Sequence, residues 1–156
     1  MISQKNKNSL LELINSKYIK DEIEESYNDL KVELSELDAN IKLIVENASN
    51  KTIITGSKSL LFLAKYGLNV IYISDEVEYE KNVTAAADLL SSNSIKYIYM
   101  IDTEKESNAV QKFKNDYKTE IITLDKLDNI SDEERDNDDN YITIMNKNLE
   151  LLKKGL

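Results

Sequence analysis

Apolar residues recur at alternating spacings of four and three between about Ile19 and Asn47, which predicts a long amphipathic helix. We expect this stripe to pack on the helix's own domain. A coiled-coil seam is the alternative, since about three heptads reach only the lower limit for that pattern. Before this helix, residues 1–8 are polar, and a short apolar cluster predicts a first helix ending near residues 15–16. The long stripe comprises Ile23, Tyr27, Leu30, Leu34, Leu37, Ile41 and Ile44, and the cluster comprises Leu10, Leu11, Leu13 and Ile14.

The pattern changes after Asn50, where short runs rich in β-branched and aromatic residues predict strands. Helical segments separate these runs, so we predict right-handed βαβ crossovers and a parallel sheet covered on both faces. Gly67 is expected to end the first of these helical segments. The predicted strands are 52–55 (TIIT), 69–74 (NVIYIS), 96–101 (KYIYMI) and 120–124 (EIITL), and the helical segments are 58–66, about 82–92 and about 107–117.

Residues 126–140 are polar and acidic and predict an exposed connection to a last helix from about Tyr141 to Lys154. Its buried stripe is predicted to comprise Tyr141, Ile144, Met145, Leu149 and Leu152. The fold class is therefore α/β, a three-layer lobe with a four-stranded parallel sheet in order 2-1-3-4 and a long N-terminal helix. We assign residues 1–18 to a polar segment and short helix, 19–48 to the long helix, and 51–156 to the lobe.

Composition narrows the possible functions. The 156 residues carry a net charge of −9 with no basic stripe, so nucleic acid is not an expected partner. No run approaches the roughly 20 apolar residues of a membrane span, and the N-terminus shows no targeting signal. Histidine and cysteine are absent, which removes the commonest transition-metal ligands and the usual general base. Because no nucleophile–base pair is recognisable, we do not expect an enzyme.

Polar residues follow each predicted strand, at the edge of a parallel sheet where ligands normally bind. Ser57, in the segment TGSKS, is expected to cap the helix after it, and an anion site is the alternative. The acidic clusters 74–76 and 102–104, with Asp125, are expected to be solvated carboxylates. Convergence on calcium, magnesium or manganese is the alternative. A calcium loop at the segment 136–140 (DNDDN) is a further alternative.

Four stretches carry a resemblance to a known family. They are LSELDANIKLI at 34–44, the strand–helix–strand 52–74 with its Tyr-Gly-Leu turn, SIKYIYMID at 94–102, and EIITLDKLDNISDEE at 120–134 followed by the closing helix NYITIMNKNLELLKKGL at 140–156. In order and spacing they resemble the C-terminal lobe of the metal-specific (zinc/manganese) solute-binding proteins of ABC transporters, cluster A-I. The resemblance implies an extracellular or periplasmic parent protein for zinc or manganese import, with an N-terminal lobe and an ABC permease as partners.

The resemblance also implies where metal ligands would lie. This lobe normally supplies a histidine or glutamate after its first strand, and that position falls on Gly56, which has no side chain. It also supplies an aspartate after its fourth strand, and that position falls on Asp125. We therefore expect a metal site that is incomplete or degenerate, with no metal or other cofactor in the isolated chain. A metal-independent binding or scaffold module is the alternative. Apolar residues early in the chain further suggest a homodimer through the N-terminal helices, unless the first helix folds back over them.

Overall fold

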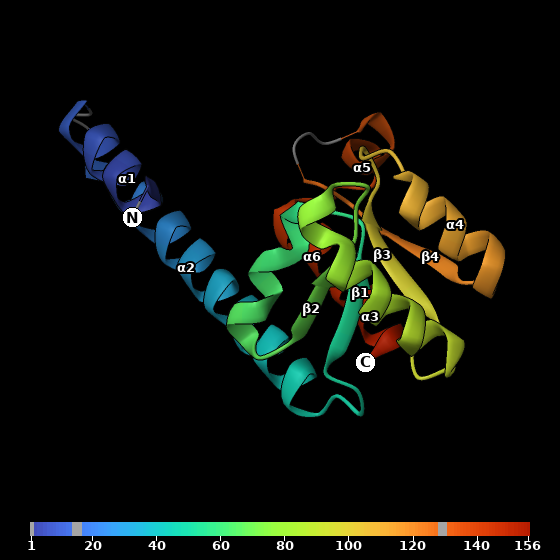
Figure 1. Ribbon diagram of the computed structural model, residues 1–156. Helices are drawn as coiled ribbons and strands as arrows, with labels where there is room; N and C mark the ends of the chain where they lie inside the picture. The colour runs from blue at the N-terminus through green and yellow to red at the C-terminus, as the bar shows by residue number, and fades with distance from the viewer. Residues whose placement is uncertain (1, 14–16, 128–130) are drawn as a thin grey trace. The chain divides into compact units, whose positions relative to one another are not determined.

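The computed structural model of the chain describes residues 2–13, 17–127 and 131–156 (Figure 1). Ile14, predicted in the first helix, lies outside these residues. The chain divides into two compact units, Met1–Asn40 and Ile41–Leu156, and helix α2 (Lys17–Glu46) runs from the first into the second. It is unbroken between Ile23 and Ile44, which confirms the predicted long helix.

The first unit is a helical hairpin. Helix α1 spans Ile2–Leu13 and therefore begins within the polar segment 1–8, ahead of the apolar cluster that predicted the first helix. Helix α1 folds back beside α2, where the Tyr27 hydroxyl donates a hydrogen bond to Gln4 Oε1 at 2.5 Å. The Lys7 ammonium lies 4.6 Å from the centroid of the Tyr27 ring. Helix α1 therefore packs against the N-terminal half of α2, with Tyr27 as a contact residue.

The second unit contains four parallel strands in the order β2-β1-β3-β4, which confirms the predicted sheet. The strands are β1 (Thr52–Thr55), β2 (Asn69–Tyr72), β3 (Tyr97–Ile101) and β4 (Glu120–Leu124). Between them lie the 3₁₀ helix η1 (Lys58–Tyr66), then η2 (Val77–Tyr79) with α3 (Glu80–Ser91), and α4 (Asn108–Tyr117). After β4 come α5 (Asp132–Asp136), α6 (Tyr141–Leu152) and η3 (Lys153–Gly155).

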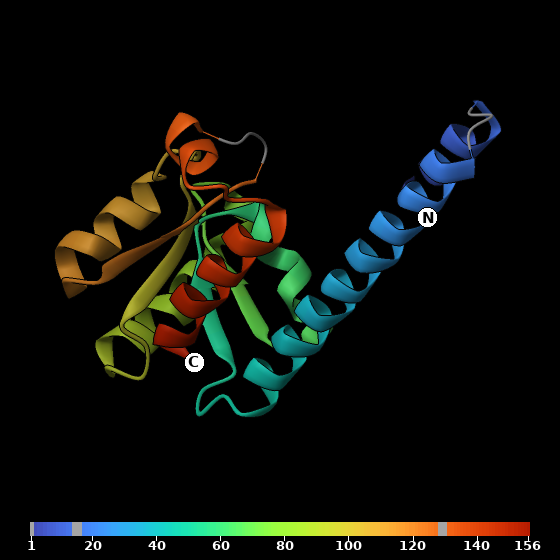
Figure 2. The same cartoon turned by 180° about the vertical axis from the view of Figure 1, so that it is seen from behind.

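Helices cover both faces of the sheet (Figures 1 and 2). α3 and α4 lie on one face, where Ala86, Leu90, Val110 and Phe113 are buried against the strands. α6 lies on the other face, and the hydroxyl of Tyr99 on β3 donates to the Leu152 carbonyl at 2.7 Å. Burial of near-continuous apolar strands between helices is what an all-parallel sheet requires.

Three details of the second unit test finer predictions. Gly67 has φ +97° and donates its N–H to the Ala64 carbonyl, so it ends η1 as predicted. The segment predicted as a strand over 69–74 forms ladder structure only to Tyr72. Tyr141 is 49% exposed, so its place in the buried stripe was wrongly predicted. It stands in the first turn of α6, and the buried face of that helix begins at Ile144 and includes Asn148.

Candidate metal site at the carboxyl ends of the strands

The candidate ligand positions lie where β1 and β4 end. Gly56 directly follows β1 and Asp125 directly follows β4. Asp102 follows β3, and its backbone N–H donates to the Leu124 carbonyl at 3.0 Å. The parallel topology therefore collects these three residues at one edge of the sheet, as the pattern of strands predicted.

Asp125 is held by Asn148 of α6. Its backbone N–H donates to Asn148 Oδ1 at 2.8 Å, and Asn148 Nδ2 donates to the Asp125 carbonyl at 2.9 Å. Asn148 is buried, and this two-way contact satisfies its amide. Sequence reasoning did not assign this role. The available signal was a polar residue at helical spacing on an otherwise apolar stripe.

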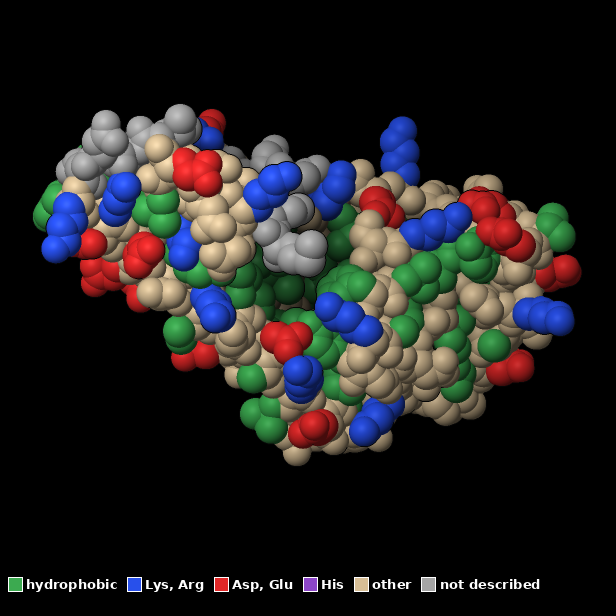
Figure 3. All heavy atoms as spheres, turned by 90° about the vertical axis from the view of Figure 1, so that its left-hand side faces the viewer, with side chains coloured by type: hydrophobic (Ala, Val, Ile, Leu, Met, Phe, Trp, Pro, Cys, Tyr) green, Lys and Arg blue, Asp and Glu red, His purple; other side chains and the backbone are tan. Residues whose placement is uncertain are grey.

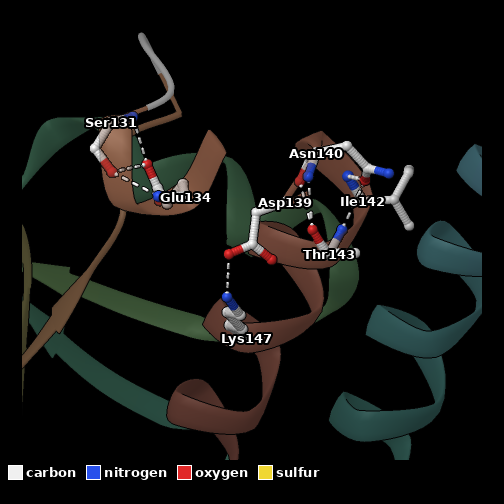
Figure 4. Close-up of polar contacts among 7 residues, drawn as sticks. All are labelled: Ser131, Glu134, Asp139, Asn140, Ile142, Thr143 and Lys147. Atoms are coloured by element: carbon white, nitrogen blue, oxygen red, sulfur yellow. Dashed lines mark hydrogen bonds and ion pairs between the residues drawn. The ribbon is translucent and has the colours of Figure 1, made fainter. Parts of the chain in front are cut away.

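The side chain of Asp125 is already partly engaged. Its Oδ1 accepts the Leu127 N–H at 2.6 Å. Burial raises the pKa of this carboxyl, the Leu127 N–H opposes that shift, and the nearby carboxylates of Glu134 and Asp102 add to it. Glu134 itself has a lowered pKa, mainly because the Ser131 hydroxyl and N–H donate to it (Figure 4). Asp125 is thus a single, half-buried carboxylate with one oxygen committed to its own loop.

Gly56 is enclosed by the core. A Cβ atom on Gly56 would lie 2.4 Å from Met100 Sδ and 2.8 Å from Val110 Cγ2, closer than real Cβ contacts allow. Met100 and Val110 are both buried. A side chain at position 56 that could bind a metal would therefore need Met100 and Val110 to move, because even its Cβ atom does not fit.

Ser57 does not provide a substitute ligand. It is fully buried, and its hydroxyl accepts the backbone N–H of Ile101 on β3 at 2.9 Å. It stands at the N-cap position of η1 but makes no capping hydrogen bond, so the predicted capping role is wrong. The hydroxyl instead links β1 to β3 just beyond their ladder.

The remaining carboxylates at this edge bind groups of the chain itself. Asp75 accepts the N–H groups of Asn108 and Ala109 at 2.9 and 2.8 Å and so caps α4. Asp102 accepts the Lys126 N–H at 3.2 Å, and Glu104 accepts the Ser59 hydroxyl at 3.0 Å. Over residues 2–13, 17–127 and 131–156, no three His, Cys, Asp or Glu side chains come together as a metal site.

The two weaker sequence signals also lead to internal contacts. Lys58, in the segment considered for anions, pairs with Glu76 at 3.4 Å and lies over the rings of Tyr72 and Tyr79. In the segment considered for calcium, Asp139 pairs with Lys147 at 2.5 Å, and Asn140 caps α6 (Figure 4).

Within the described chain, no helix has the length and apolarity needed to cross a membrane.

Comparison with known proteins gives consistent matches. Residues 10–155 match a family described as "ZnuA: Zinc-uptake complex component A periplasmic". The zinc-binding protein AdcA of Streptococcus pyogenes is 26% identical over 125 residues, which is 77% of this chain and 24% of AdcA. The metal-dependent lipoprotein YcdH of Bacillus subtilis superposes with a TM-score of 0.68 at 26% identity, over 88% of this chain and 53% of YcdH.

Other solved structures share the fold at lower identity. The Zn(II)-bound ZnuA-like domain of Streptococcus pneumoniae AdcA gives a TM-score of 0.67 at 24% identity, over 96% of this chain and 57% of that domain. The laminin-binding protein Lbp of Streptococcus pyogenes gives 0.70 at 20% identity, over 96% of this chain and 58% of Lbp. The chain thus spans from about a quarter to just over half of the length of these relatives.

Proposed function

Because the chain belongs to the family of zinc-uptake complex component A, we propose that it is the C-terminal lobe of a solute-binding protein for zinc or manganese import through an ABC transporter. The match over residues 10–155 carries this proposal, and the four-stranded fold supports it. The proposal places the parent protein at the extracellular face of the membrane or in the periplasm. Its partners are an N-terminal lobe and an ABC permease, and its role is transport rather than catalysis.

We further propose that this lobe by itself does not hold the transported metal tightly. The supporting observation is the enclosure of Gly56 by Met100 and Val110, which leaves Asp125 as the one carboxylate at a family ligand position. Zinc in proteins is usually bound by four ligands with nitrogen or sulfur donors, and the sequence contains neither histidine nor cysteine. A single half-buried carboxylate does not meet that requirement.

Isothermal titration calorimetry with zinc and with manganese tests this proposal. We expect no stoichiometric site of micromolar or tighter Kd. Asp125→Ala is expected to leave the isotherm unchanged. Gly56→His should not create a site, because its Cβ collides with Met100 and Val110. One micromolar site that is lost in Asp125→Ala would overturn the incomplete-site proposal while leaving the transport family intact.

A metal-independent binding or scaffold module is the second candidate function. It is favoured by the strand-end carboxylates Asp75, Asp102 and Asp125, which all accept hydrogen bonds from the chain's own backbone. A thermal-shift screen with zinc, manganese, calcium and anions separates the two functions. A ligand at about 100 times its Kd stabilises the fold by roughly 2.7 kcal/mol. The incomplete site predicts no shift with zinc or manganese, so a shift with either metal overturns the incomplete-site proposal and shows that this lobe handles the metal. A shift only with anions supports the second function.

We also propose that the chain forms a homodimer through α1 and α2. The support is a set of apolar side chains that stay exposed although α1 folds back on α2, namely Leu10 (48%), Ile19 (42%) and Leu30 (40%). Exposed apolar patches commonly mark association sites. Light scattering over a range of concentrations tests this, with Leu11→Glu combined with Ile23→Glu as the disrupting variant. A chain that stays monomeric, with no change in mass or solubility in that variant, contradicts it.

A further inference from the structure

The helical hairpin of the first unit carries a groove between α1 and α2. We call it the hairpin groove, and its lining includes Lys7, Leu10, Ile19, Glu22, Ile23 and Leu30. Its floor is apolar and exposed, with Leu10 from α1 and Ile19 and Leu30 from α2 all at least 40% accessible. Hydrophobic side chains interspersed with charged ones at the molecular surface are visible in Figure 3.

The two helices line the hairpin groove with opposite charges. α1 contributes Lys7, and α2 contributes Glu22. The same contrast extends along the two helices. α1 carries two lysines and one glutamate, whereas the part of α2 beside it, residues 17–30, carries two lysines and five carboxylates. The hairpin groove therefore lies between a weakly basic helix, α1, and an acidic one, the first half of α2.

This charge arrangement selects one way of pairing two hairpins. In a twofold dimer both copies use the same surface. If the axis runs along the hairpins, α1 of each copy faces α2 of the other, and opposite charges meet. If the axis runs across the hairpins, α2 faces α2, and the acidic sides repel each other. Charge complementarity of this kind fixes orientation more than it adds affinity.

We propose, on the basis of the homodimer proposed above, that two copies pair groove to groove with α1 of each copy against α2 of the other. The result is a four-helix arrangement in which Lys7 of one copy faces the partner's Glu22, twice. The occupant of the hairpin groove is thus a second copy of this chain, and its apolar floor is covered by the equivalent residues of that copy.

Charge reversal tests the pairing by sedimentation equilibrium. Lys7→Glu alone and Glu22→Lys alone should each weaken the dimer roughly tenfold, because two pairs per dimer become repulsive. Mixing the two variants should restore the affinity, because every Lys7–Glu22 contact in the mixed dimer again joins opposite charges. Lys5→Glu and Glu25→Lys are matched controls, since they change the same charges outside the lining of the hairpin groove. A purely structural defect from loss of the Lys7–Tyr27 contact would not recover on mixing.

Cysteine crosslinking gives a second readout, because the native chain contains no cysteine. A mixture of Lys7→Cys and Glu22→Cys chains should form a crosslinked dimer faster than either variant alone. Two results would overturn this pairing and leave the homodimer standing. The first is faster crosslinking of Glu22→Cys chains to one another than to Lys7→Cys chains. The second is unchanged dimer affinity in both charge-reversal variants, although Leu11→Glu with Ile23→Glu abolishes the dimer. A chain that is monomeric at every concentration overturns both the pairing and the homodimer.

Discussion

Tyr99 shows how a single side chain joins two layers of the lobe. Its ring is buried on β3, and its hydroxyl donates to the Leu152 carbonyl near the end of α6 at 2.7 Å. Gly155 stands so close that a Cβ there would lie 2.5 Å from the same hydroxyl. The absence of a side chain at position 155 therefore makes room for this bond. Burial raises the pKa of the Tyr99 phenol to about 12.

At this residue we predict a stability change that depends on pH. Tyr99→Phe should lower the free energy of unfolding by about 1 kcal/mol near neutral pH, because the buried Leu152 carbonyl loses its donor. The folded state holds the phenol proton more tightly than the unfolded state, whose pKa is about 10. The contribution of Tyr99 to the free energy of unfolding is therefore fully present below about pH 10 and declines as the pH rises toward about 12. The deficit of the variant should therefore shrink across that range.

Urea unfolding at several pH values measures this effect, with Tyr117→Phe as an exposed tyrosine control. The comparison must be made as wild type minus variant, since lysines titrate in the same range. A deficit that stays constant up to pH 11.5 would contradict a titrating contribution from Tyr99.

Helix α6 begins with a complete capping box. Asn140 Oδ1 accepts the N–H groups of Ile142 and Thr143 at 2.9 and 3.0 Å. The Thr143 hydroxyl in turn accepts the Asn140 N–H at 2.8 Å, which completes a capping box (Figure 4). Two otherwise unpaired donors of the helix start and the N–H of the cap residue are thereby satisfied. α6 carries Asn148, so this cap also supports the residue that holds Asp125.

We expect Asn140→Ala to destabilise the lobe by about 1 kcal/mol, the usual cost of removing such a cap. Asn140→Ser should retain most of the stability because serine also accepts from the helix start. Asn146→Ala, on an exposed position of the same helix, is the control for loss of an asparagine. Chemical denaturation of the three variants provides the measurement. Equal stability of Asn140→Ala and Asn140→Ser would show that the cap contributes nothing.

The strands were predictable as elements because their runs of Ile, Val, Tyr and Thr have no helical period, and β1 and β4 match the predicted bounds. The candidate site was predictable only in outline. Its place after β1 and β4 followed from topology, and Asp125 followed from the resemblance. The role of Ser57 was missed because hydroxyl capping and hydroxyl bridging between strands share the same local sequence. The enclosure of Gly56 depends on Met100 and Val110, which are distant in the chain, and local spacing cannot reveal it.

On the scale of the whole molecule, burial is distributed unevenly along the chain. Over the fully described stretch from Lys17 to Glu36, no residue is buried. By contrast, Ile53, Ile54, Ile98 and Tyr99 of the two central strands are at most 1% exposed. Local opening should therefore cost much less in the first half of α2 than in the sheet.

Hydrogen exchange followed by mass spectrometry should show this difference. In dilute protein, peptides covering residues 17–36 should exchange far sooner than peptides covering β1 and β3. At concentrations that favour the proposed dimer, the first half of α2 should gain protection, because association stabilises the ordered hairpin. The Leu11→Glu, Ile23→Glu variant should show no such gain. Protection of residues 17–36 equal to that of β1 in dilute protein would contradict the prediction.

The strand order has a consequence for how the lobe assembles from the unfolded chain. β1 lies between β2 and β3, and its partners differ greatly in sequence distance. Thr52 pairs with Asn69 only 17 positions later, whereas Ile54 pairs with Ile98 after 44 positions. Tyr97 and Glu120, which join β3 to β4, are 23 positions apart. Closing the longest of these loops costs about 0.8 kcal/mol more chain entropy than closing the shortest, by the logarithmic dependence on loop length. Direct formation of the β1–β3 ladder therefore costs the most chain entropy of the three pairings. The Ser57 bridge and the enclosure of Gly56 both depend on this ladder. Prior docking of β2 and of α3 shortens the effective loop and lowers that cost.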